Sequence, residues 1–110
     1  RFTVKTNTID FDAMQKIVDD MYNGDIHAIK TGLQHKGCIM RINAIISVHD
    51  NDIRQNDIVE MIKSLKDDVA AIDNISVGDY AMALLDLYGI EKYQGDKKYV
   101  KYMIKSNMDI

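Results

Sequence analysis

The chain repeats one tetrapeptide without change: Met61-Ile62-Lys63-Ser64 returns as Met103-Ile104-Lys105-Ser106, 42 residues later. Each copy lies among apolar residues that are spaced as on one face of a helix. The repetition therefore predicts one helical unit that the chain uses more than once. A unit of this kind buries its apolar face against the next unit, and stacked helical repeats mostly present surfaces to partners.

Two weaker similarities extend the pattern. Residues 25–33 resemble residues 57–65 at a separation of 32, and residues 44–48 resemble residues 83–87 at a separation of 39. The predicted order is helix A, helix B, helix A, helix B and a final A-like helix. Residues 69–75 are expected to be an insertion between the second A and B helices.

Apolar spacing and end signals predict six helices between residues 10 and 106, preceded by an extended arm over residues 1–9. Asp10, Asp25 and the pair Ser76 and Asp79 are expected to cap helix starts, and Ile9 and Met14 are placed for a hydrophobic staple. Gly24 and Gly89 are expected to end helices. The predicted core contains Ile42, Ile45, Ile46, Ile62, Leu65, Leu84 and Leu85.

Length and composition indicate a single all-α domain over residues 1–110. The chain has no proline, six glycines and a formal net charge of −3, so few residues interrupt a helix. Cys38 is the single cysteine, which fits a reducing compartment and predicts a cytoplasmic protein. No apolar run approaches the length of a membrane span and no signal peptide is visible, although the chain begins at Arg1.

The titratable residues predict no active site, metal or cofactor. His35 and Cys38 are three residues apart, but two ligands do not make a closed zinc site. His49 is expected to lie at the edge of the core, and His27 to be exposed. The carboxylates of Asp67 and Asp68 diverge on a helix, as do those of Asp19 and Asp20, so neither pair forms a shared acid–base site. The protein is therefore predicted not to be an enzyme.

Charge is unevenly distributed along the chain. Residues 50–79 contain eight acidic and three basic residues, whereas residues 92–105 contain five lysines and one acidic residue. Lysines with interspersed tyrosines can bind single-stranded nucleic acid. Tyr99 is instead assigned to the apolar stripe of the last helix, and the lysines to its solvated outer face. Nucleic acid is therefore not the expected partner.

The two B helices are expected to offer a surface to a protein partner. An outward methionine with polar neighbours on each helix makes an adaptable apolar spot. Acidic residues nearby suit a basic partner. The candidate partner-binding residues are Met40, Asn43, Ser47, Asp67, Asp68, Asp79, Met82 and Asp86.

The stretch from Ser76 to Tyr93, SVGDYAMALLDLYGIEKY, resembles a HEAT-type repeat. More narrowly, its Asp-aromatic-Ala-x-Ala-Leu-x-Leu-x-Gly-Ile-x-x-Tyr pattern is similar to small HEAT-like immunity proteins of bacterial toxin–immunity systems, including contact-dependent growth inhibition. The resemblance extends over about residues 57–93, without the usual repeat proline. It implies a short α-α superhelix that binds and blocks a cognate toxin domain, commonly a nuclease, without catalysis. The alternatives are a general helical adaptor and a small nucleic-acid binder that uses the Lys/Tyr-rich last helix.

Overall fold

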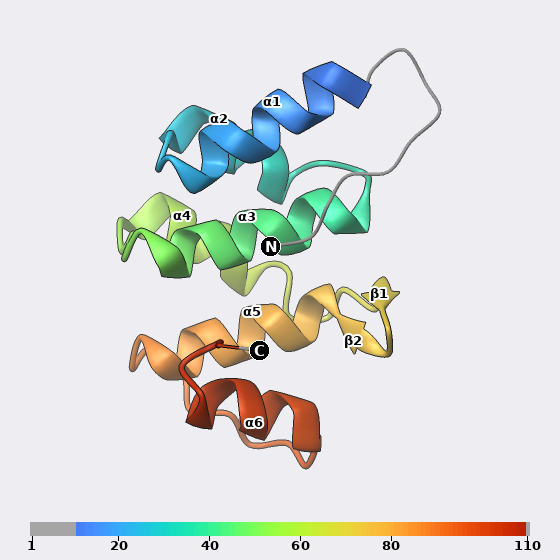
Figure 1. Ribbon diagram of the computed structural model, residues 1–110. Coiled ribbons are helices and arrows are strands. Elements are labelled where there is room, and N and C mark those ends of the chain that lie inside the picture. The colour runs from blue at the N-terminus through green and yellow to red at the C-terminus, as the bar shows by residue number, and fades with distance from the viewer. Residues whose placement is uncertain (1–10, 110) are drawn as a thin grey trace. The chain divides into compact units, whose positions relative to one another are not determined.

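The computed structural model describes residues 11–109 and contains six helices and one two-stranded hairpin among them (Figure 1). The predicted arm over residues 1–9 and the Asp10 cap lie outside the described residues. Ile9, one of the two residues of the predicted staple with Met14, lies outside them as well. The mostly helical fold class is confirmed. The elements are α1 (Phe11–Tyr22), α2 (Ile26–Leu33), α3 (Cys38–Asp50), α4 (Asn56–Lys63), β1 (Ala71–Ile72), β2 (Ile75–Ser76), α5 (Val77–Leu87) and α6 (Lys98–Lys105).

The chain divides into two compact units, residues 1–53 and residues 54–110. In the first unit α1, α2 and α3 all pack against one another. Gly32 of α2 lies close to both other helices, because an added Cβ there would collide with the Met21 sulfur and lie 3.0 Å from the Ala44 Cβ. The core of this unit includes Val18, Met21, Ile29, Leu33, Met40, Ile42, Ile45 and Val48.

The helix ends of the first unit follow the sequence prediction. Gly24 has a φ of +84°, and the following Asp25 N–H donates to the Asp20 carbonyl at 3.0 Å, which closes α1. The Asp25 side chain then accepts a hydrogen bond from the Ala28 N–H at 3.0 Å and caps α2. Both assigned roles are confirmed.

In the second unit α5 packs against both α4 and α6. Its start is a capping box, in which the Ser76 hydroxyl accepts from the Asp79 N–H and the Asp79 carboxylate accepts from the Ser76 N–H. At its end Gly89 has a φ of +72°, and the Ile90 N–H donates to the Leu85 carbonyl. The core of this unit includes Ile58, Ile62, Val77, Tyr80, Leu84, Leu85, Val100 and Met103.

The insertion at residues 69–75 forms the hairpin, which was not predicted. β1 pairs antiparallel with β2, with Ala71 opposite Ser76 and Ile72 opposite Ile75. The two residues between the strands, Asp73 and Asn74, have positive φ angles of 51° and 70°. A two-residue hairpin turn of type I′ requires positive φ at both residues, and Asp and Asn tolerate it better than most residues.

The repeated tetrapeptide has the same position at the ends of two helices, α4 and α6. α4 and α6 are both eight residues long, and in each copy the serine is the C-cap and its hydroxyl donates to the methionine carbonyl. The two helices bury different positions of the tetrapeptide: the second residue, Ile62, is buried in α4, whereas the first residue, Met103, is buried in α6.

Of the other two predicted repeat separations, the structure agrees with one and not with the other. α3 and α5 begin 39 residues apart, as predicted, but α2 and α4 begin and end 30 residues apart. The predicted separation of 32 is therefore wrong by two residues, and Ile26 and Ile58 are not equivalent. The expected core is confirmed except at Ile46 and Leu65, which are half-buried.

Candidate functional site

Three candidate partner-binding residues of α3 are buried: Met40, Asn43 and Ser47. The Asn43 amide oxygen accepts a hydrogen bond from the Tyr22 hydroxyl at 2.8 Å, and the Ser47 hydroxyl donates to the Ala44 carbonyl at 2.7 Å. The expectation that they face outward is wrong. The reason is that α3 packs against both α1 and α2, so more than one stripe of this helix is covered.

The two candidate acids of α5 are occupied by contacts inside the unit. The Asp79 side chain is 2% exposed, and besides its role in the capping box it accepts a hydrogen bond from the Lys97 ammonium at 2.9 Å. The half-buried Asp86 carboxylate accepts a hydrogen bond from the Tyr93 backbone N–H at 2.8 Å. The expected exposure of Asp79 is therefore wrong, and Asp86 is an anchor for the chain that follows α5.

Asp79 and Asp86 together hold residues 91–97, which we call the strap. They are seven residues apart, about two helical turns, and therefore lie on the same side of α5. Within the strap the Lys97 N–H donates to the Tyr93 hydroxyl at 3.1 Å. A Cβ at Gly95 would collide with the Tyr93 phenol, so a larger residue at this position would have to displace the ring.

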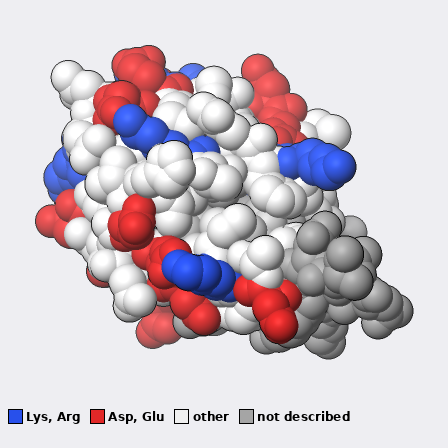
Figure 2. All heavy atoms as spheres, turned by 90° about the horizontal axis from the view of Figure 1, so that it is seen from above, with Lys and Arg blue, Asp and Glu red and all other residues white. Residues whose placement is uncertain are grey.

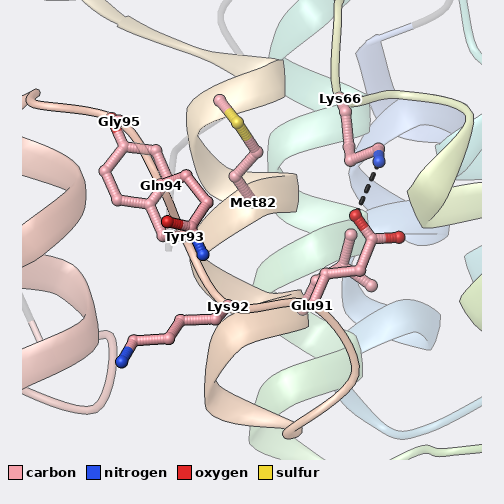
Figure 3. A pocket seen from close by; sticks show the side chains of 8 residues that line it. Lys66, Met82, Glu91, Lys92, Tyr93, Gln94 and Gly95 are labelled. Carbon is pink, nitrogen blue, oxygen red and sulfur yellow. Dashed lines mark hydrogen bonds and ion pairs between the residues drawn. The ribbon is translucent and has the colours of Figure 1, made fainter.

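A pocket of about 340 Å³ lies between the strap and α5 (Figure 3). Met82 and Leu85 line it from α5, and the remaining lining residues are Lys66, Glu91, Lys92, Tyr93, Gln94 and Gly95. In Figure 3 the Met82 side chain stands between the Tyr93 ring on one side and the Lys66–Glu91 pair on the other. The pocket therefore has an apolar floor and a charged rim.

An ion pair frames one side of this pocket. The Lys66 ammonium donates to the Glu91 carboxylate at 2.6 Å, and both side chains are partly exposed. This hydrogen bond raises the pKa of Lys66 and lowers the pKa of Glu91 from their ordinary values. Both groups are therefore charged near neutral pH. The ion pair connects the first residue of the strap, Glu91, to Lys66 in the turn after α4.

Two further pKa values are shifted around α5. The hydrogen bond to Asp79 raises the pKa of Lys97 above its ordinary value. Burial, with smaller contributions from the charges of Asp73 and Asp79, raises the pKa of Tyr80 to about 12. Tyr80 is therefore neutral in the folded protein across the physiological range.

The eight candidate residues do not form one surface. Met82 lines the pocket, Asp67 is exposed, and the half-buried Asp68 accepts a hydrogen bond from the Ala70 N–H at 3.1 Å. Sequence reasoning missed Lys66 and Tyr93 as parts of this pocket. Lys66 is placed by Glu91, 25 residues later in the chain, and Tyr93 is placed by Asp86, 7 residues earlier. Gly95 two residues after Tyr93 was the one local sign of a tight curl at this position.

The structure also places the histidines and the cysteine that the sequence analysis considered for chemistry. His27 is exposed, as predicted, and the His35 Nδ1 accepts a hydrogen bond from the Gly37 N–H at 2.9 Å. Cys38, which is half-buried, is the first residue of α3. Among residues 11–109 no three His, Cys, Asp or Glu side chains are grouped closely enough to hold a metal ion. The absence of catalysis stays a prediction.

On the face in Figure 2, acidic and basic side chains are interspersed around uncharged ones. No helix within residues 11–109 has the length and apolar character needed to cross a membrane. Comparisons with protein-family models, curated proteins and solved structures find no match.

Proposed function

We propose that the protein is a non-catalytic binding module that receives an apolar side chain of a protein partner in the pocket over Met82. The observation that carries this proposal is the combination of an apolar floor, Met82 and Leu85, with an ion pair and a lysine at the rim. Protein interfaces have this composition, with a desolvated apolar centre and polar groups around it. Methionine adapts its shape to the side chain that it meets.

The proposed partner is a cognate bacterial toxin domain, and the protein is then an immunity protein. The support is the resemblance of residues 57–93 to HEAT-like immunity proteins, together with the acidic balance of residues 50–79. An acidic inhibitor suits a basic nuclease, because complementary charge accelerates the encounter. Within the second unit, the exposed acids of this segment are Asp57, Glu60, Asp67 and Asp73.

The HEAT-like superhelix and the cytoplasmic location are part of the same proposal. Within each unit consecutive helices pack against each other, for example α2 against α3 and α4 against α5, which is compatible with helical repeats. The single cysteine suits a reducing compartment. A toxin that acts on nucleic acid inside the cell would be neutralised there.

The test has two stages, which separate binding from immunity. The full chain is immobilised to capture a partner from the native cell, and a captured protein is then expressed alone and together with this chain. The proposal predicts that the partner inhibits growth when expressed alone and that co-expression restores growth. A captured partner that is harmless alone would favour the general adaptor instead.

The role of the pocket is tested by Met82→Glu, with Val69→Glu as the matched control. Val69 is 87% exposed and does not line the pocket. A carboxylate on the pocket floor should speed dissociation of the complex at least about tenfold, because the bound partner would remove water from a charge on an apolar surface. Equal dissociation rates for the two folded variants would show that the partner binds elsewhere.

A further inference from the structure

The outer face of α6 differs from the sequence expectation. Tyr99 is 58% exposed and Tyr102 is 56% exposed, whereas Val100 and Met103 are buried. The assignment of Tyr99 to the apolar stripe is therefore wrong. The reason is the direction of the helix: its buried side is centred on Val100 and Met103, and Tyr99 lies about 100° of helical rotation away from Val100.

Three lysines lie beside these tyrosines. Lys98, Lys101 and Lys105 are exposed, and among residues 11–109 none of the three forms an ion pair. Lys97 differs, because its ammonium is bound to Asp79. α6 itself contains no acidic residue; Asp96 and Asp109, both exposed, lie outside its two ends.

Helical geometry arranges the five side chains in two adjacent rows. Lys98, Lys101 and Lys105 are three and four residues apart, so they form one row with rises of about 4.5 and 6 Å along the axis. Tyr99 and Tyr102 are three residues apart and form a second row between the lysines and the buried side. We call these five residues the α6 face.

We propose that the α6 face binds single-stranded nucleic acid, with bases stacked on Tyr99 and Tyr102 and phosphates against the three lysines. Stacking needs aromatic side chains that are open to solvent, and both tyrosines are more than half exposed. A backbone of regularly spaced negative charges matches this row of exposed ammonium groups. The proposal is independent of the pocket over Met82, because no residue of the α6 face lines that pocket.

An acidic protein surface is the competing partner class, and the rings distinguish the two. Acidic side chains would be attracted by the lysines alone, whereas bases also need the aromatic faces. Replacing both tyrosines by leucine keeps apolar area but removes stacking, and replacing both by phenylalanine keeps the ring. Lysine reversal weakens either partner, so the tyrosine variants decide.

The experiment measures fluorescence anisotropy of a labelled single-stranded oligonucleotide of about 12 nucleotides, titrated with the full chain between about 50 and about 200 mM salt. Three neutralised phosphates predict a slope near −2 for log affinity against log salt, from about −0.7 for each contact. The Tyr99→Leu/Tyr102→Leu variant should bind at least about tenfold more weakly. The Tyr99→Phe/Tyr102→Phe variant should bind as the unmodified chain does.

Matched charge reversals complete the test. Lys101→Glu should weaken binding and flatten the salt slope, whereas Lys36→Glu, at an exposed lysine of the first unit, should leave both unchanged. Circular dichroism confirms that each variant is folded. The proposal is overturned if the oligonucleotide does not bind at the lower salt concentration, if the leucine variant binds as tightly as the phenylalanine variant, or if a polyglutamate peptide of equal charge binds as well as the oligonucleotide.

Discussion

The Asp86 carboxylate accepts a hydrogen bond from the Tyr93 backbone N–H at 2.8 Å. This contact joins α5 to the middle of the strap, seven residues further along the chain. It holds Tyr93 beside Met82, where the tyrosine forms one side of the pocket. An acid that the sequence suggested as an outward contact for a partner thus shapes the site on which the proposed function depends.

Removing this anchor should loosen the strap. We expect Asp86→Ala to lower the free energy of unfolding by about 1–2 kcal/mol, because the Tyr93 N–H loses a charged acceptor. Asp86→Asn keeps an acceptor oxygen and should lose less. Chemical denaturation measures the stability, and hydrogen exchange at the Tyr93 amide reports the strap directly. Asp67→Ala, at an exposed acid, should change stability by less than about 0.5 kcal/mol.

Asp79 and Lys97 form one ion pair but should not contribute equally to stability. Asp79→Ala removes the half of the capping box in which the Asp79 carboxylate accepts from the Ser76 N–H, and it also removes the bond to Lys97, so we expect a loss of about 2 kcal/mol. Lys97→Ala should lose less than about 1 kcal/mol, because the lysine side chain is 60% exposed. Thermal unfolding of the two variants checks the order. Equal losses would contradict the capping role of Asp79.

Gly78 should tolerate alanine less well than Gly32. A Cβ at Gly78 would collide with the Lys66 backbone carbonyl and lie 3.0 Å from the Asp68 carbonyl, neither of which moves easily. A Cβ at Gly32 meets the flexible Met21 side chain first. Both sites would gain about 1 kcal/mol of helix propensity. We expect a net loss of at least about 2 kcal/mol for Gly78→Ala and a smaller one for Gly32→Ala, measured by urea unfolding.

Alkaline pH should destabilise the fold through Tyr80. Its pKa is raised from 10.0 to about 12 in the folded protein, so the folded state holds the proton more tightly than the unfolded state. This stabilisation is complete below pH 10 and is lost as the pH rises toward 12. The loss should be of order 2 kcal/mol. Lys66 and Lys97, whose pKa values are also raised, lose stabilisation at alkaline pH in the same direction.

The Tyr80 prediction is checked by urea unfolding at several pH values above 9, with Tyr80→Phe as the control. The variant has no phenol to ionise, so its stability should fall less steeply with pH. Identical pH profiles for the two proteins would show that Tyr80 does not cause the alkaline loss.

Local signals predicted the helices and their ends well. The caps at Asp25 and Ser76, and the glycine ends at Gly24 and Gly89, depend on groups within a few residues of one another. The hairpin turn at Asp73 and Asn74 was missed, although two residues that favour positive φ between apolar neighbours are a local sign of it.

The candidate site was predicted only at Met82, because its other parts depend on distant contacts. Lys66 meets Glu91 across 25 residues, and the burial of Met40 and Asn43 follows from the packing of α3 on two helices at once. Periodicity assigns one buried face to a helix and cannot show a second one. It also placed Tyr99 on the wrong side of α6.

The most direct test of the pocket as a partner site is site-specific photo-crosslinking in the native cell. A photoreactive residue replaces Lys92, which is exposed at the pocket rim, and in a separate control protein it replaces Lys36 in the first unit. We predict that position 92 crosslinks to a polypeptide that inhibits growth when expressed without this chain, and that position 36 does not. The account is contradicted if position 92 gives no crosslink while position 36 captures the partner, or if the polypeptide captured at position 92 is harmless alone.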